Sequence, residues 1–216
     1  IDIKDAREGQ ELNFTTVTQE THKDKKWPKG HQNVGEPIIL RDYQVSIINQ
    51  FLSQPQCLQE IATGAGKTLV TATLSQCVEQ YGGTLIIVPN KDLVTQTEKD
   101  YINLGLDAGV YFGDRKEIGK THTICTWQSL NVLDKRFKDG ESEIGLHNLT
   151  DGISAIIVDE VHMAKADVLK RLLAGPFAKI PIRWGLTGTI PKEDWAYVSL
   201  VVSLGGVVNR LKASDL

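Results

Sequence analysis

Hydrophobic and polar positions follow two different periods along most of this chain. Short apolar runs of strand length are bounded by polar or glycine-rich segments, and several of them are apolar on both faces. Longer segments with apolar residues at helical spacing lie between these runs. The predicted strands cover 57–61, 84–88, 108–112, 122–126, 153–159 and 182–187, and the predicted helices cover 38–52, 67–81, 91–105, 127–137, 165–175 and 193–206. This alternation predicts an α/β fold, a mostly parallel sheet with helices on both faces in three αβα layers.

The first part of the chain does not share this pattern. Residues 1–36 are polar and weakly periodic, with a basic cluster formed by Lys23, Lys25, Lys26 and Lys29. We expect a solvated arm or linker here, and the basic cluster leaves a DNA-contacting arm as the alternative. The α/β domain is expected to occupy 37–216, and the acidic stretch within 139–152 is expected to be a surface loop.

Composition changes this picture little. The 216 residues are 41% hydrophobic and 24% charged, as in an ordinary globular domain, and the net charge of -3 gives no bulk field for a polyanion. The three cysteines, Cys57, Cys77 and Cys125, are widely spaced in apolar surroundings, which indicates reduced thiols. No apolar run is long enough to span a bilayer and no signal-peptide pattern is present, so we expect a cytoplasmic protein. A start at Ile1 and an end at Leu216 in mid-pattern suggest a piece of a longer protein.

One glycine-rich stretch carries the first chemical signal. The sequence EIATGAGKTLV, residues 60–70, lies between a predicted buried strand and a predicted helix. Gly64 and Gly66 let backbone amides turn toward a phosphate at a helix start, where unpaired N–H groups already favour an anion. Lys67 would neutralise the β and γ phosphates, and the Thr68 hydroxyl would bind magnesium. The strict pattern has a glycine where this chain has Ile61, so a glycine turn that only caps the helix is the alternative.

A second signal follows the predicted strand 153–159. In IIVDEVH, residues 156–162, three β-branched residues place Asp159 at the carboxyl end of a buried strand, the same edge from which the phosphate loop emerges. Asp159 can hold the magnesium ion while Glu160 orients and deprotonates the attacking water. The alternative is an acidic helix start that only favours the helix dipole. Together the two motifs predict hydrolysis of a nucleotide, with ATP and Mg²⁺ as the cofactors.

At this point the chain resembles the first RecA-like motor domain of superfamily 2 helicases and translocases. The resemblance rests on ATGAGKT and DEVH, followed by GLTGT at 185–189, and it extends over residues 38–216. LRDYQ at 40–44 resembles the glutamine motif of the DNA-acting members, IIVPNKDLVTQ at 86–96 resembles motif Ia, and CTWQSL at 125–130 resembles motif Ic. Arg-Asp-Tyr-Gln and Thr-Trp-Gln-Ser are most similar to phage recombination helicases of the UvsW type, and XPB-type and restriction-type translocases share much of the pattern.

The resemblance implies a role for each matching residue. The catalytic set would be Lys67, Asp159, Glu160 and His162, with His162 relaying the presence of the γ-phosphate. Nucleotide binding would use Arg41, Gln44, Thr63, Gly64, Ala65, Gly66, Lys67 and Thr68, and the metal ligands would be Thr68 and Asp159. Thr187 and Thr189 would couple the acid pair to the nucleic-acid face. DNA backbone contacts would come from Pro89, Asn90, Thr126, Trp127, Gln128 and Ser129.

Several of these residues have simpler structural interpretations. Trp127 could be a core aromatic residue, His162 a core histidine with one hydrogen bond, and Asn90 and Ser129 helix caps. Helix capping and phosphate binding are compatible. Arg115 and Lys116 in GDRKE could extend a DNA track, although a solvated loop is the preferred interpretation.

The resemblance implies the ATP-binding and hydrolysing motor domain of a DNA helicase acting on branched or duplex DNA in recombination, repair or replication. A duplex translocase subunit of the restriction or remodelling type is one alternative. A nucleotide-gated DNA-binding module without useful hydrolysis is another, although Glu160 speaks against it. Such motors close ATP against a second RecA-like domain with an arginine finger, and no Gln-x-x-Gly-Arg-x-x-Arg segment is present. We therefore expect weak nucleotide binding, slow hydrolysis and no detectable unwinding by this chain alone.

Overall fold

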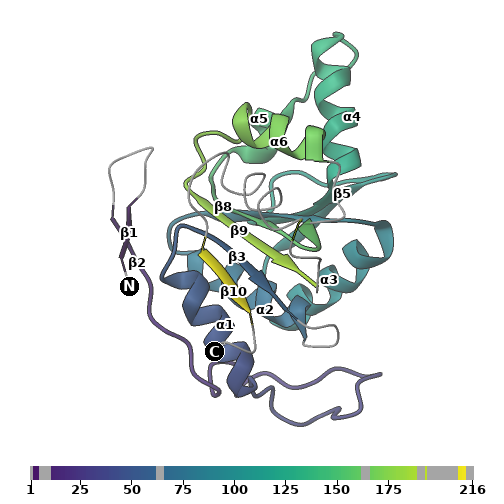
Figure 1. Ribbon diagram of the computed structural model, residues 1–216. Coiled ribbons are helices and arrows are strands. Elements are labelled where there is room, and N and C mark those ends of the chain that lie inside the picture. Colours follow the sequence, from purple (N-terminus) through teal and green to yellow (C-terminus); the bar gives the residue numbers. More distant parts are fainter. Residues whose placement is uncertain are drawn as a thin grey trace.

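The computed structural model describes residues 2–4, 11–61, 66–161, 166–188, 193 and 209–212. Within these residues, one sheet contains eight strands in the order β10-β3-β9-β8-β4-β7-β5-β6 (Figure 1). Its strands are β3 (Gln56–Glu60), β4 (Gly83–Val88), β5 (Ala108–Phe112), β6 (Arg115–Lys116), β7 (His122–Thr126), β8 (Ile153–Val158), β9 (Ile182–Thr187) and β10 (Asn209–Lys212).

The sheet is parallel except at one edge. Adjacent strands from β10 to β5 pair in parallel, and only β6 pairs antiparallel with β5. The register places Val88 beside Thr126 and Glu60 beside Thr187, so the carboxyl ends of the central strands meet at one edge. Helices supply the connections from β3 to β4, from β4 to β5, from β7 to β8 and from β8 to β9, whereas β5 and β7 are joined through the short strand β6. The predicted fold class is confirmed.

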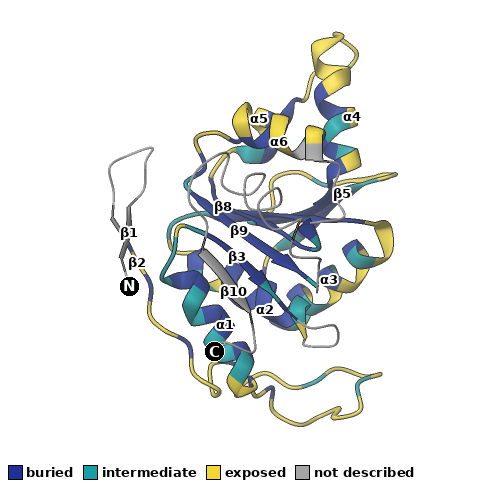
Figure 2. Cartoon of the chain, viewed as in Figure 1, coloured by how far each residue is buried: buried dark blue, intermediate teal, exposed yellow. Residues whose placement is uncertain are grey.

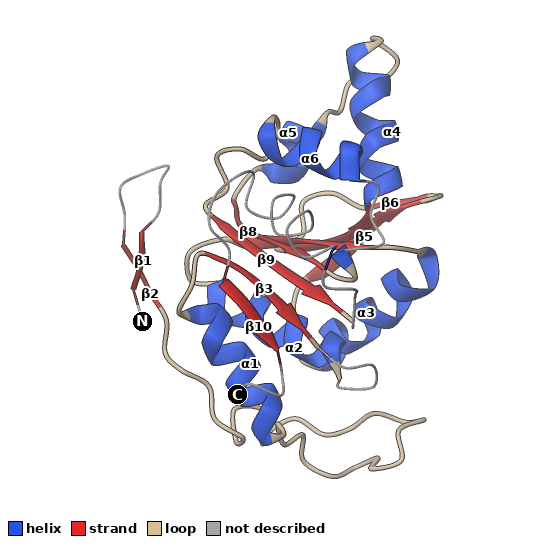
Figure 3. Ribbon diagram, viewed as in Figure 1, coloured by secondary structure: helices blue, strands red, loops and turns tan. Residues whose placement is uncertain are grey.

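Helices cover both faces of this sheet (Figure 3). The helices are α1 (Asp42–Leu52), α2 (Lys67–Val78), α3 (Lys91–Asn103), α4 (Trp127–Lys138), α5 (Leu146–Thr150) and α6 (Ala166–Ala174). The first three lie on one face and the last three on the other. Because both sheet faces are covered, β4, β8 and β9 are buried along their whole length (Figure 2). The strand side chains pack in two separate apolar clusters, one on each face of the sheet.

Most predicted elements are found within two or three residues of the expected bounds, and the differences are local. The expected loop at 139–152 contains the short helix α5, and the expected loop at 113–117 contains β6. Both elements are too short to show a hydrophobic period. The predicted helix at 193–206 lies outside the described residues apart from residue 193.

The N-terminal segment packs against the domain more closely than a solvated linker would. A small hairpin of β1 (Asp2–Lys4) and β2 (Glu11–Asn13) begins it. Leu12, Phe14 and Val17 are then buried against the α1–α3 side of the sheet. Asn49 of α1 receives the Val17 N–H at 2.8 Å and returns a hydrogen bond to its carbonyl at 3.0 Å. The buried His22 ring contacts the Thr73 hydroxyl at 2.8 Å. Residues 12–22 are thus part of the folded body, which corrects the expectation for this part of the arm.

The thiols are free and have no reactive surroundings. Cys57 and Cys125 are buried and Cys77 is half-buried, without a disulfide among them. Burial raises the pKa of Cys57 to about 12 and that of Cys77 to about 11, so the thiols are protonated at neutral pH. In the described part of the chain, no helix has the length and apolar character needed to cross a membrane.

A buried polar chain connects α2, α3, β4 and β7 beneath the sheet. The Ser75 hydroxyl lies 2.6 Å from the Tyr101 hydroxyl and 2.8 Å from that of Thr84. The His122 ring contacts Thr84 at 2.7 Å through Nδ1 and Glu79 at 2.9 Å through Nε2. Burial lowers the pKa of His122 below its ordinary 6.5, and Glu79 opposes that shift only in part.

Because His122 is buried, we predict that the protein loses stability in mild acid. The unfolded chain protonates His122 near pH 6.5 while the folded chain keeps it neutral, so stability is complete above that pH and falls as the pH drops further. We expect the free energy of unfolding, measured by urea titration between pH 7.5 and 5, to fall by up to about 1.4 kcal/mol per pH unit per such histidine. His122→Gln should flatten the slope. An unchanged slope in His122→Gln would assign the loss to other groups.

Candidate nucleotide site

The carboxyl edge of the central strands brings the two predicted motifs together. β3 leads into the phosphate loop, and α2 begins directly after it at Lys67. β8 ends at Val158 and is followed by Asp159 and Glu160. Ile61, which replaces the first glycine of the strict pattern, is fully buried and donates its N–H to the Thr187 carbonyl at 2.7 Å. Its backbone thus extends the pairing of β3 with β9, and its side chain packs in the apolar core. Thr63, Gly64, Ala65, His162 and Thr189 lie outside the described residues.

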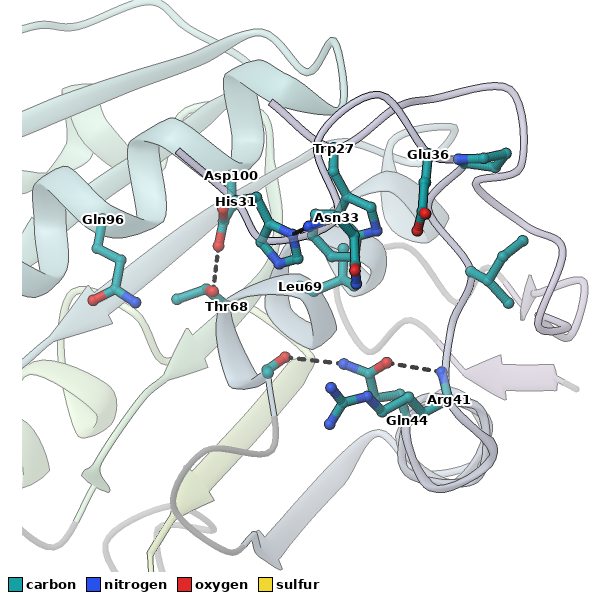
Figure 4. A pocket seen from close by; sticks show the side chains of 13 residues that line it. Trp27, His31, Asn33, Glu36, Arg41, Gln44, Thr68, Leu69, Gln96 and Asp100 are labelled. Carbon is teal, nitrogen blue, oxygen red and sulfur yellow. Dashed lines mark hydrogen bonds between the residues drawn. The ribbon is translucent and has the colours of Figure 1, made fainter. Parts of the chain in front are cut away.

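Gly66 closes the phosphate loop in a conformation that only glycine adopts easily. Its φ of 71° is left-handed, and a Cβ there would stand 2.5 Å from Nε2 of Gln44. That same nitrogen donates to the Gly66 carbonyl at 3.4 Å, while Oε1 of Gln44 accepts the Arg41 backbone N–H at 2.9 Å. Gln44, which is buried, thus ties the start of α1 to the start of α2 (Figure 4).

Lys67 makes the central electrostatic contact of the site. Its Nζ lies 3.6 Å from Oδ1 of Asp159 and pairs closely with Oε1 of Glu160. The Asp159 side chain is only 4% exposed, so this pair is weakly screened by solvent. Asp159 is held by its own N–H, which donates to the Ile87 carbonyl of β4 at 2.9 Å. Lys67, the predicted phosphate-binding cation, therefore lies directly beside Asp159 and Glu160, which are predicted to meet the metal ion and the water.

The backbone at Glu160 is strained. Its φ of 49° is the only left-handed value of a non-glycine residue among the described ones. Side chains rarely adopt this region, and such strain is typical of functional sites. A Cβ on Gly188 would stand 3.8 Å from Oε2 of Glu160, so the end of β9 is adjacent to the acid pair. Thr187, one of the two expected coupling residues, is fully buried at the end of β9.

A cavity of about 510 Å³ opens beside the start of α2 (Figure 4). Arg41 and Gln44, assigned to the nucleotide from the sequence, line it together with Gly66 and Thr68. Its size is within the range of small-molecule sites. The predicted glutamine motif and the start of α2 therefore line one cavity.

Two aromatic residues of the N-terminal segment complete the cavity wall, although no sequence motif includes them. The rings of Trp27 and His31 stack at 4.0 Å with planes 6° apart, and both line the cavity. Lys26 and Pro37 form a bridge that closes the intervening loop. A flat aromatic surface beside a phosphate loop can stack on a nucleotide base. In the sequence, the only indication of this wall was Trp27 in a polar stretch. The packing of the N-terminal segment places its ring at the cavity.

Asp100 of α3 is a further cavity residue that the motifs did not indicate. The Thr68 hydroxyl donates a hydrogen bond to Oδ2 of this carboxylate. Burial raises the pKa of Asp100, and the Thr68 hydrogen bond and the nearby His31 partly counter that rise. A second carboxylate thus lies against the predicted metal ligand.

The oxygen donors here suit a magnesium ion. The Thr68 hydroxyl and the Asp159 carboxylate are hard oxygen ligands of the type that Mg²⁺ prefers. In the part of the chain that the structure describes, no three side chains of His, Cys, Asp or Glu form a ready metal cage. Magnesium bound with a nucleotide needs no such cage, because phosphates and waters fill most of its coordination positions.

Most of the expected DNA-contact residues lie together at the ends of β4 and β7. Asn90 begins α3 and accepts the Leu93 N–H at 3.0 Å, and Thr126 begins α4 and accepts the Ser129 N–H at 3.2 Å. Gln128 is exposed and donates to the Pro89 carbonyl at 3.5 Å, which links the two helix starts. Asn90 and Thr126 are thus helix caps, whereas Ser129, which was expected to be a cap, is the residue whose N–H is capped by Thr126. These local roles leave the DNA role open.

The remaining candidates have structural roles. Trp127 is 9% exposed and packs in the cluster between the sheet and α4, as the core interpretation expected. Arg115 pairs with Glu98 through two hydrogen bonds of 2.8 and 2.7 Å and with Glu117 at 3.3 Å, and Lys116 lies over the Tyr111 ring. Because the Arg115 charge is balanced locally, it adds little to a DNA track.

Comparisons with known proteins agree with this geometry. Residues 37–192 match the family model described as type III restriction enzyme, res subunit. The DNA 3'-5' translocase XPB2 of Sulfurisphaera tokodaii is 29% identical over 188 residues, which cover 85% of this chain and 38% of that protein. The DNA 3'-5' helicase XPB of Mycobacterium tuberculosis is 33% identical over 159 residues, 72% of this chain and 27% of that protein. The chain therefore spans well under half the length of these relatives.

The fold has close structural counterparts. A crystal structure of the UvsW helicase from bacteriophage T4 superimposes with a TM-score of 0.68 at 17% identity, covering 91% of this chain and 69% of that one. The phosphate loop, the acid pair and this parallel sheet define a RecA-like motor domain of superfamily 2. The chain belongs to the family of the type III restriction enzyme res subunit, whose model matches most of its length.

Gly66 provides a direct test of the loop geometry. Gly66→Ala adds both a left-handed alanine and a contact with Gln44, whereas Gly140→Ala adds only the first, because nothing lies within 4 Å of its Cβ position. In urea titrations we expect the free energy of unfolding of Gly66→Ala to fall about 1–3 kcal/mol more than that of Gly140→Ala. A Gln44→Ala background should remove this difference. Equal losses in the two glycine variants would show that the close approach is unimportant.

Proposed function

We propose that this chain is the ATP-binding and hydrolysing motor domain of a superfamily 2 DNA helicase or translocase. The observation that carries the proposal is the placement of the Lys67 amine against both Asp159 and Glu160, at the edge where the phosphate loop enters α2. The relatives named as DNA helicases and translocases support DNA as the substrate. Because the chain spans only part of those relatives, the activity of the whole protein is part of this proposal.

Different residues of the site would bind different parts of ATP. The base would enter the cavity between Gln44 and the Trp27–His31 pair. The phosphates would meet the N-terminus of α2, where unpaired amides and the helix dipole favour negative charge. Lys67 would then exchange its carboxylate partners for the β and γ phosphates.

This exchange has a chemical consequence for Glu160. While Glu160 pairs with the Lys67 ammonium group, its negative charge is compensated and its lone pairs are engaged. A triphosphate that draws Lys67 away leaves the carboxylate available to orient water and accept its proton. Binding of ATP would thereby release the base that hydrolyses it. His162 would report the γ-phosphate to the nucleic-acid face through Thr187 and Thr189.

Thr68 and Asp159 would hold Mg²⁺, which when bound neutralises charge on the β and γ phosphate oxygens. Rapid turnover would further require an arginine from a second RecA-like domain, since such residues raise the rate about 10³ to 10⁵-fold.

The rival functions differ in how the energy of hydrolysis is used. A duplex translocase would use the same ATP site and move along DNA without separating the strands. A nucleotide-gated clamp would bind DNA and hydrolyse nothing useful. The strained Glu160 beside Lys67 favours a hydrolytic motor over the clamp, because a clamp needs no base in a costly conformation. Substrate branching, direction of movement and a role in recombination, repair or replication belong to the whole protein.

The role of Glu160 gives the decisive prediction. In the full-length protein, Glu160→Gln should lower DNA-stimulated ATP turnover by about 10² to 10⁴-fold, because the amide cannot accept the proton of water. ATP affinity, measured by equilibrium binding, should persist in this variant and fall in Lys67→Ala. The control is Glu143→Gln in the exposed loop before α5, which should turn over ATP normally. Unchanged turnover in Glu160→Gln would show that another group is the base.

The shared end of β4 and β7 gives a prediction for DNA. Gln128→Ala removes an exposed neutral donor, so DNA affinity should fall about fivefold, the loss of one hydrogen bond, whatever the sequence of the DNA. The salt dependence of binding should not change, since no charge is lost. Gln76→Ala, at an exposed position of α2, is the matched control. Fluorescence anisotropy at several salt concentrations measures both quantities, and an unaltered affinity would remove Gln128 from the interface.

A further inference from the structure

The Thr68 hydroxyl is oriented by a carboxylate outside every motif of the site. Asp100 belongs to α3 and lies 32 positions further along the chain, yet its Oδ2 accepts the hydroxyl proton of Thr68 (Figure 4). The contact joins the first turn of α2 to the C-terminal half of α3. Both residues line the cavity next to Gly66.

A hydroxyl group has one proton and two lone pairs. A metal ion needs a lone pair and is repelled by a proton that points toward it. When the proton is committed to Asp100, the lone pairs of the Thr68 oxygen face away from that carboxylate and are available to a cation. Groups of this kind, which hold a metal ligand in position, commonly change metal affinity about 10 to 100-fold when mutated.

Stability gives no evident reason for Asp100 to be a carboxylate. It is half-buried, and burial of a negative charge is costly. Within the described ranges, no lysine or arginine forms an ion pair with it. A partly buried acid that forms no ion pair with lysine or arginine in the described part of the chain, and that faces a cavity, is typical of a functional group.

We propose that Asp100 is a positioning residue for the nucleotide-bound metal ion, which it serves by accepting the Thr68 proton and turning the lone pairs of that oxygen toward the ion. This inference rests on the proposed function, because it presumes that the cavity and phosphate loop bind a nucleotide with Mg²⁺. Asp100 would touch neither the metal nor the nucleotide.

Calorimetric titration of this chain with ADP provides the test, performed once with Mg²⁺ and once with a chelator. The ratio of the two dissociation constants measures how much the metal strengthens binding. We expect Asp100→Ala to reduce this ratio about tenfold. Its affinity for metal-free ADP should not fall, because removing a negative charge from the cavity lining does not weaken the binding of an anion.

Three further variants make the test specific. In Asp100→Asn the amide oxygen can still accept the Thr68 proton, so most of the metal enhancement should be retained. In a Thr68→Val background, Asp100→Ala should have no additional effect, since no hydroxyl remains to be oriented. The matched control is Asp92→Ala in the exposed first turn of the same helix, which should leave the ratio unchanged. Thermal unfolding verifies that each variant is folded.

The possible results distinguish a failure of the proposed Asp100 role from a failure of the proposed nucleotide site. An unaltered ratio in Asp100→Ala would overturn the inference. A higher ratio would also overturn it, because Asp100 would then compete with the metal for Thr68. So would an equal loss in Asp100→Asn and Asp100→Ala, which would exclude the hydrogen bond as the cause. Wild-type chain that binds no ADP under either condition would instead refute the proposed nucleotide site, and the inference with it.

Discussion

The interaction on which this molecule depends is the attraction between the Lys67 ammonium group and the carboxylates of Asp159 and Glu160. These charges come from segments far apart in the chain, and they meet because β9 alone separates β3 from β8 in a parallel sheet. Parallel strands end at the same edge, so the loop after β3 and the acid pair after β8 open toward one space. The partly buried setting strengthens the attraction and holds the ammonium group and the carboxylates together.

The layers of the fold maintain this arrangement in different ways. The sheet strands are rigid because both faces are buried, and the polar chain from Tyr101 to His122 pins α2 and α3 to the strands beneath them. The N-terminal segment is added to that side and supplies an aromatic wall to the cavity. Gln44 then links the cavity to the phosphate loop through Gly66. A change at the cavity can therefore reach the start of α2 through one amide side chain.

Elements with a strong local signal are the ones that the sequence predicts well. The predicted strands 84–88 and 122–126 match the structure closely, because short runs rich in β-branched residues and bounded by turns have few alternative structures. The helix α5 escapes prediction because a five-residue helix has no measurable period. The arm has the pattern of a solvated segment because Leu12, Phe14 and Val17 are isolated apolar residues in a polar stretch, and their burial depends on a groove formed by other elements.

By itself the sequence determined the order of strands and helices, the α/β class and the identity of the charged residues at the carboxyl edge, since these depend on local periodicity and on motifs of fixed spacing. Only the tertiary structure decided that Trp27 and His31 line the cavity, that Asp100 holds the Thr68 hydroxyl, and that Glu160 pairs with Lys67. These contacts join residues from separate elements, and no spacing along the chain encodes them. The order of the parallel strands brings Glu160 to Lys67, and the packing of the N-terminal segment, α1, α2 and α3 on one face of the sheet brings the other side chains together.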